Sequence, residues 1–235
     1  MENTQNVNYS YIGDNLRRIR EECASIADRL GVAMPDVAAV TKSATDEEVK
    51  ALVTEYGQPI IAENRTSMFR DRYALFDDAQ RPSMHLIGSL QTNKVKYIIK
   101  DCALIHSLDS LRLAAEIERQ AQRFGVRARV LVEINSAREE AKGGILPEDA
   151  DAFLSSLSDL GSIDVVGVMT MGPVLADREE YRPYFRLTAD IYRRWCDCGY
   201  LGDAPVLSMG MSDSYTVAIE EGATLVRIGR ALFRK

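Results

Sequence analysis

The sequence has few of the residues that most often build metal centres or disulfide frameworks. Its 235 residues include two histidines and four cysteines. Cys196 and Cys198 are separated by one residue and have no second pair, so no zinc site is expected. The absence of a paired cysteine framework indicates reduced thiols, as in the cytoplasm.

Long apolar runs and basic stretches are also missing. No apolar run approaches the roughly 18 residues of a membrane span, and the N-terminus lacks the charged-then-apolar pattern of a secretory signal. The net charge is −6, and no basic stripe offsets it, which argues against a nucleic-acid partner. We therefore expect a soluble, cytoplasmic protein that binds neither nucleic acid nor a membrane.

The remaining composition suits one folded domain over residues 1–235. Hydrophobic residues make up 46% of the chain, and its length is near the roughly 250 residues of a single (β/α)8 barrel. No low-complexity segment or flexible linker divides it. Residues 1–8 are polar and expected to be disordered. Apolar residues at helical spacing predict a helix over 9–30, ahead of the first strand.

Apolar segments then alternate with helical patterns along the chain. Strands are expected at 37–41, 59–62, 84–87, 103–106, 128–134, 164–169, 205–208 and 224–228. Helices are expected between them, among them 111–124 and one that begins at Pro147. This order predicts an α/β fold, a single closed (β/α)8 TIM barrel with an extra N-terminal helix. An open doubly wound sheet is the alternative, but no GxGxxG follows the first strand.

Lys42 follows directly on the first predicted strand. A lysine is unfavourable to bury, so its place just beyond an apolar run is informative. Thr45 and Glu48 form a capping-box pattern, which predicts that a helix begins there. Lys42 would then lie at the carboxyl end of a parallel strand, where barrels place their chemistry. On this stretch alone, a solvated loop lysine is an equally good interpretation.

Two glycine-containing loops, 208–213 and 227–230, end the last two predicted strands. Each alone could be an ordinary turn. Glycine lets the backbone approach a ligand, and the loops after strands seven and eight of barrels frequently bind phosphate. A lysine facing such a site suits a phosphorylated aldehyde held as a Schiff base, provided that a lowered pKa leaves the amine free to attack. His85, a lone histidine within a strand, is more often a buried core residue.

Several motifs in order resemble the pyridoxal phosphate homeostasis protein family, which is similar to the barrel domain of bacterial alanine racemase. The resemblance runs from the first helix to the end of the chain. The motifs are AVTK at 39–42, AEN at 62–64, HLIGSLQTNK at 85–94, HSLDS at 106–110, KGG at 142–144, GVMTMGP at 167–173, SMGMSDSY at 208–215 and VRIGRALF at 226–233.

The resemblance implies a binding site for pyridoxal 5′-phosphate. It implies that Lys42 forms an aldimine with this cofactor. Ser212, Gly229 and Arg230 would border the phosphate, the last two through backbone N–H groups. Arg227 would lie near the pyridine nitrogen, where a cation disfavours ring protonation and weakens the cofactor as an electron sink.

The same resemblance places Asn64, His85 and Met211 in the pocket wall. The sequence departs from the family pattern at Ala62, where many members have glycine. It also departs at Arg230, where threonine or serine is common and would offer the phosphate a hydroxyl group.

Racemases of the related fold need a second acid or base from a separate β-domain, and no such domain is expected in this chain. We therefore expect a protein that holds pyridoxal 5′-phosphate and takes part in intracellular cofactor homeostasis, with little or no catalysis. Its expected partners are the cofactor and pyridoxal-phosphate-dependent apoenzymes, and the expected state is a monomer. One alternative is an amino-acid racemase that uses Lys42 and a second base. Another is a cofactor-free Schiff-base aldolase whose phosphate site belongs to the substrate.

Overall fold

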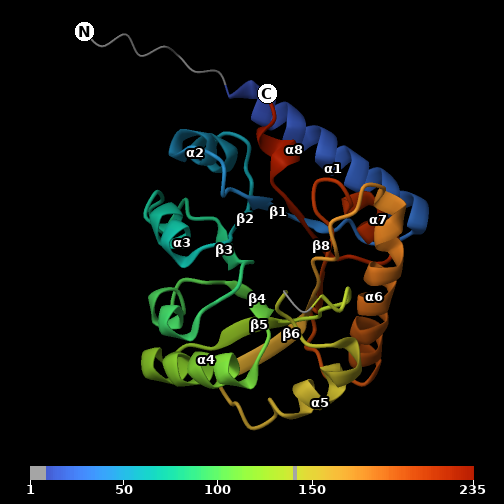
Figure 1. Cartoon of the computed structure of the whole chain (residues 1–235). Helices are drawn as coiled ribbons and strands as arrows, with labels where there is room; N and C mark the ends of the chain where they lie inside the picture. Colours follow the sequence, from blue (N-terminus) through green and yellow to red (C-terminus); the bar gives the residue numbers. More distant parts are fainter. Residues whose placement is uncertain (1–8, 140–141) are drawn as a thin grey trace.

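Eight parallel strands close into a barrel in the computed structural model, which describes residues 9–139 and 142–235 (Figure 1). Neighbouring strands pair in sequence order, and β8 pairs with β1. The strands are β1 (Asp36–Val40), β2 (Ile60–Glu63), β3 (Ser83–Leu86), β4 (Leu104–Leu108), β5 (Ala128–Glu133), β6 (Ile163–Met169), β7 (Val206–Ser208) and β8 (Leu225–Ile228). The predicted barrel is confirmed. Residues 1–8, for which the sequence predicts disorder, lie outside the described residues.

Helices and short 3-10 turns (η) surround the strands. They are α1 (Ser10–Leu30), α2 (Asp46–Thr54), α3 (Thr66–Tyr73), η1 (Thr92–Tyr97), α4 (Leu111–Phe124), η2 (Pro147–Asp149), α5 (Ala150–Ser155), η3 (Arg178–Tyr181), α6 (Arg182–Asp197), α7 (Tyr215–Glu220) and α8 (Arg230–Phe233). The α4 helix has the predicted bounds. The helix expected from Pro147 begins as η2 and continues as α5.

Side chains of the strands alternate between the barrel interior and the layer beneath the helices. Ala38 and Val40 of β1 pack inside the barrel with Ala62, Ile87 and Leu225. The strand residues that alternate with these inward-facing ones belong to the larger core beneath the helices. Both faces of each strand are therefore covered, as an all-parallel sheet requires.

The N-terminal helix α1 packs beside the end of the chain (Figure 1). Its apolar stripe is buried against α7 and α8, and it ends at Gly31, which has a left-handed backbone (φ 67°). Asn15 Nδ2 donates to the carbonyl oxygens of Leu232 (3.0 Å) and Arg234 (2.8 Å). The predicted extra helix thus covers the barrel next to α8, which has only four residues.

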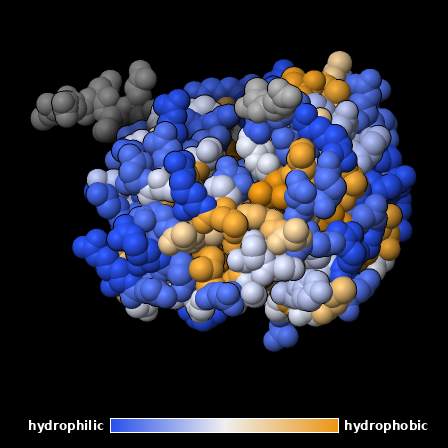
Figure 2. Space-filling view, turned by 60° about the horizontal axis from the view of Figure 1, so that its bottom comes forward, coloured by the Kyte–Doolittle hydropathy of each residue, from blue (hydrophilic) through white to orange (hydrophobic). Residues whose placement is uncertain are grey.

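The face of the molecule shown in Figure 2 is mostly hydrophilic. Figure 2 shows apolar side chains gathered near the middle and along the right side of one face. Among the described residues, no helix combines the length and apolar character needed to cross a membrane.

Candidate functional site

Lys42 lies at the carboxyl end of the barrel, as predicted. It comes two residues after β1, and its side chain is exposed. The loop that carries it ends at Thr45, whose Oγ1 accepts a hydrogen bond from Glu48 N (3.2 Å), while the Glu48 carboxylate accepts one from Thr45 N (2.8 Å). This capping box fixes where α2 begins. Because β1 pairs with β2 and β8, the loops that follow those two strands flank Lys42.

The loops after β7 and β8 are joined to each other. Ser212 Oγ accepts a hydrogen bond from Ala231 N (3.3 Å), and the Arg230 guanidinium pairs with the Asp213 carboxylate. Arg230 therefore directs its side chain toward the neighbouring loop, which leaves its backbone as the part near the barrel mouth. Met211, in the same loop, is 37% exposed.

Gly229 brings the end of β8 close to β1. A Cβ at this position would lie 3.2 Å from the Val40 carbonyl oxygen and 3.3 Å from Val40 Cβ. A side chain here would crowd the strand end that precedes Lys42. The lysine loop and the β8 loop are thus adjacent at one end of the barrel.

Asn64 follows β2 at the same end. Its Oδ1 atom is buried, and no hydrogen-bond partner for it is found within residues 9–139 and 142–235. A Cβ on Gly88 would lie 2.2 Å from the Asn64 carbonyl oxygen, so the loops after β2 and β3 touch through their backbones. Because an unsatisfied buried carbonyl oxygen is unfavourable, Asn64 Oδ1 is suited to accept a hydrogen bond from a ligand.

Arg227 lies inside the barrel and is 2% exposed. Its guanidinium donates to Ser208 Oγ (2.6 Å) and to the Thr170 carbonyl oxygen (2.8 Å), at the carboxyl ends of β7 and β6. Burial lowers the Arg227 pKa to about 10, and Glu133 opposes this decrease. Burial and the charge of Asp109 raise the Glu133 pKa to about 7, while Arg227 lowers it. Arg227 thus keeps its positive charge at neutral pH.

His85 is hydrogen-bonded within the barrel at both ring nitrogens. Nε2 is 3.2 Å from Ser83 Oγ, and Nδ1 is 3.1 Å from His106 Nε2. His106 Nδ1 in turn lies 3.0 Å from Ser208 Oγ, which Arg227 also contacts. Burial lowers the His85 pKa to about 4 and places that of His106 well below its usual value. Two neutral imidazoles therefore form a hydrogen-bonded chain from Ser83 to Ser208, which Arg227 also contacts.

Two residues beside Lys42 were not predicted to have a role: Arg72 on α3, and Glu63 at the end of β2. Glu63 is fully buried, and its carboxylate accepts a hydrogen bond from the Thr41 hydroxyl. Burial raises the Glu63 pKa to about 7, against the opposing effects of the Thr41 hydroxyl and the Asn64 backbone N–H. In the sequence Glu63 directly follows the predicted strand 59–62, which is a weak signal. Arg72 has no sequence signal, because arginines on amphipathic helices usually face solvent.

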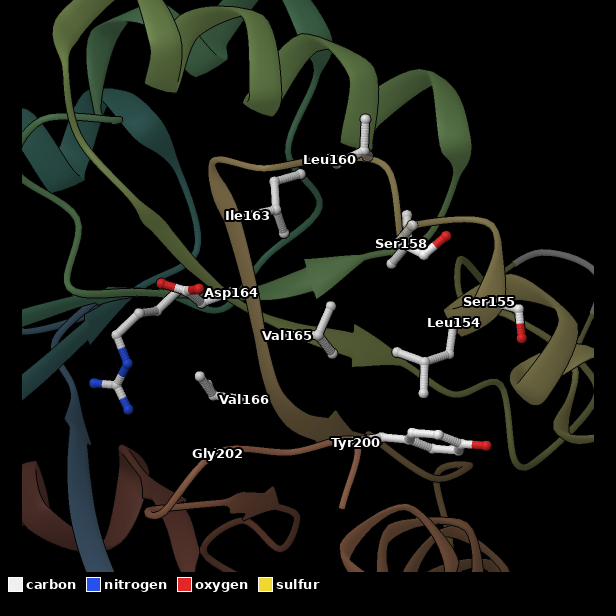
Figure 3. Close-up of a pocket in the computed structure, with 12 residues that line it drawn as sticks. Leu154, Ser155, Ser158, Leu160, Ile163, Asp164, Val165, Val166, Tyr200 and Gly202 are labelled. Atoms are coloured by element: carbon white, nitrogen blue, oxygen red, sulfur yellow. The ribbon is translucent and has the colours of Figure 1, made fainter. Parts of the chain in front are cut away.

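The cavity in Figure 3 lies at the opposite end of the barrel. Its volume is about 680 Å3, and it is lined mainly by apolar side chains at the start of β6 and around Tyr200. Leu154 and Val165 converge on the Tyr200 ring, and Ser155 and Ser158 lie on the α5 side. Since these residues precede or begin strands, the cavity is separate from Lys42. No cluster of three or more potential metal ligands occurs among the described histidines, cysteines and carboxylates.

The structure therefore gathers Lys42, Asn64, Met211, Ser212, Gly229 and the Arg230 backbone around the barrel mouth. Arg227 reaches this end from the interior. His85 is deeper, because Ile87 on the same inward face of β3 lies nearer the carboxyl end.

Comparison with known proteins gives a consistent set of relatives. Residues 14–234 match the family model described as alanine racemase, N-terminal domain. The chain is 43% identical over 177 residues to the pyridoxal phosphate homeostasis protein of Aquifex aeolicus, covering 75% of this chain and 77% of that protein. It is 35% identical over 218 residues to the protein of the same name in Deinococcus radiodurans, with 93% and 97% covered.

A solved structure of PipY from Synechococcus elongatus PCC7942 with PLP bound has a similar fold. Its TM-score to this chain is 0.81 at 26% sequence identity, and the match covers 94% of this chain and 99% of PipY.

Proposed function

Because the chain belongs to the pyridoxal phosphate homeostasis protein family, we propose that it binds pyridoxal 5′-phosphate through Lys42 and serves intracellular cofactor homeostasis. The observation that carries this proposal is the pairing of β1 with β8. This pairing sets Lys42 beside Gly229 and the joined loops after β7 and β8. The PLP-bound PipY structure supports the choice of ligand.

The residues at the mouth fit such a molecule. Lys42 would hold pyridoxal 5′-phosphate through its amine, and the cofactor when bound would supply an aldehyde group for that covalent attachment. Ser212, Gly229 and Arg230 would border the phosphate, with glycine allowing close approach of the backbone. Asn64, with its unpaired buried Oδ1, and Met211 would line the pocket.

Arg227 and His85 would act from the interior. A guanidinium that stays charged disfavours protonation of a nearby ring nitrogen, which makes the cofactor a weaker electron sink. Both histidines of the chain are buried and share a hydrogen bond, so neither is exposed at the mouth to transfer a proton. These two features support our proposal that the protein has little or no catalytic activity.

Storage and delivery of the cofactor suit a site of this kind. We assign pyridoxal-phosphate-dependent apoenzymes as the recipients, with the protein acting as a cytoplasmic monomer. The exposed Lys42 side chain supports this role, because a cofactor held there would stay within reach of solvent.

The experiment is visible absorbance of the purified protein with added pyridoxal 5′-phosphate. A band from the lysine adduct is expected, and Lys42→Ala should abolish it. Lys50→Ala, which removes an exposed lysine on α2, should leave the band unchanged. Borohydride reduction followed by peptide mapping should place the label on Lys42. A protein that stays colourless would refute the proposal, and racemisation of amino acids well above the rate of free cofactor would refute its non-catalytic part.

A further inference from the structure

Arg72 reaches from α3 to the loop that carries Lys42. Its side chain is only 7% exposed. Nη2 donates to the carbonyl oxygens of Ala44 (2.5 Å) and Thr41 (3.5 Å), which lie on either side of Lys42 in sequence. Nη1 pairs with the Asp46 carboxylate in the first turn of α2. One planar guanidinium thus holds three points of the segment 41–46.

Glu63 holds the same segment from β2. Its Oε1 accepts the hydrogen bond of the Thr41 hydroxyl and lies 3.5 Å from Arg72 Nε. Its Oε2 and Arg72 Nε have no hydrogen-bond partner within the described part of the chain. Burying a carboxyl group and a guanidinium together is unfavourable unless their contacts compensate.

We infer that Arg72, together with Glu63, is a positioning residue for Lys42. The two side chains fix the backbone of residues 41–46, and this keeps the Lys42 amine where the cofactor aldehyde arrives. The inference rests on the proposed function. Neither Arg72 nor Glu63 reaches the mouth itself, so both act through the loop.

Two probes separate positioning from general support of the fold. Pyridoxal 5′-phosphate tests the position of the Lys42 amine, because its aldehyde must react with that amine. Pyridoxine 5′-phosphate carries an alcohol in place of the aldehyde, so it tests only the non-covalent pocket. A misplacement of about 1 Å can slow a reaction about 100-fold without a comparable loss of binding.

Arg72→Met is therefore expected to slow growth of the visible band by about 10- to 100-fold. Calorimetric binding of pyridoxine 5′-phosphate should change by less than about two-fold, since that binding does not use the amine. Arg72→Lys should give an intermediate rate, because a point charge replaces the planar fork. Arg70→Met is the matched control on the same helix, where Arg70 is exposed, and it should behave like the wild type.

Thr41→Val tests the same contacts to the segment 41–46 with a smaller change. It removes only the hydroxyl that donates to Glu63, so it should fold even if Arg72→Met does not, and it should slow the band by about 3- to 10-fold. Wild-type rates in both Arg72→Lys and Thr41→Val would overturn the inference. Equal weakening of both probes would also overturn it, because the residues would then only support the fold. A wild type that never develops the band would refute the proposed function as well.

Discussion

Glu63→Gln is expected to make the stability of the fold less dependent on pH. Glu63 is fully buried, and burial raises its pKa from 4.5 to about 7. A raised pKa means that the folded state binds this proton more tightly than the unfolded chain. The favourable contribution is therefore complete below pH 4.5 and is lost as the pH rises through about 7. Glutamine keeps an oxygen for the Thr41 hydroxyl but cannot ionise.

The size of the effect follows from the change in pKa. One pKa unit corresponds to about 1.4 kcal/mol, so the increase from 4.5 to about 7 corresponds to about 3 kcal/mol. Between about pH 5 and about pH 8, the wild type should lose about 2 kcal/mol of unfolding free energy relative to Glu63→Gln. Arg72 remains held by Asp46 and two carbonyl oxygens in the variant.

Urea unfolding followed by tryptophan fluorescence measures this difference. Trp195 is the single tryptophan and is fully buried, so its emission should shift on unfolding. Glu133 and the histidines are present in both proteins. The difference between the wild-type and Glu63→Gln curves of unfolding free energy against pH therefore reports on Glu63 alone. Glu55→Gln, an exposed substitution just after α2, should follow the wild-type pH dependence. The prediction would be refuted if the unfolding free energies of Glu63→Gln and the wild type changed with pH in the same way. It would also be refuted if the variant were less stable than the wild type at about pH 8. Either result would show that Arg72 stabilises ionised Glu63 more than burial destabilises it.

Two further predictions concern the barrel interior and a loop contact. His85 and His106 should both remain neutral at about pH 5.5, because burial lowers both pKa values, and imidazolium nitrogen shifts in NMR spectra would contradict this. The contribution of His85 to stability should be lost as the pH falls from 6.5 toward about 4, and that of His106 should be lost as the pH falls well below 6.5. Gly88→Ala should lower the unfolding free energy by about 1–3 kcal/mol, because the new Cβ would strike the Asn64 carbonyl oxygen. Gly161→Ala, where a Cβ meets nothing within 4 Å, is the control, and equal melting temperatures would refute the clash.

The strands and the place of Lys42 could be predicted because both depend on local signals. Alternating apolar segments and caps mark where elements begin, and parallel topology sends every strand end to one side of the barrel. Lys42 and Gly229 are far apart in sequence, but each is a residue that follows a strand. Their proximity follows from closure of the barrel.

Contacts made by single side chains across the barrel could not be predicted in this way. Nothing in the sequence shows that His85 and His106, 21 residues apart, share a hydrogen bond. Arg72 has the spacing of a surface arginine, and only the fold turns it toward the lysine loop. The direction of the Arg230 side chain, toward Asp213, also depends on how two loops meet.

The position of α1 determines how late in the synthesis of the chain this helix can complete its packing. The helix precedes the barrel in sequence, but most of its apolar stripe is covered only once α7 and α8 exist, and Asn15 hydrogen-bonds to a residue 217 positions later. A growing chain must therefore keep most of this apolar stripe uncovered while the eight strands are synthesised. Joining such distant segments is slow, so the docking of α1 is the step at which folding of this barrel is most exposed to misassociation.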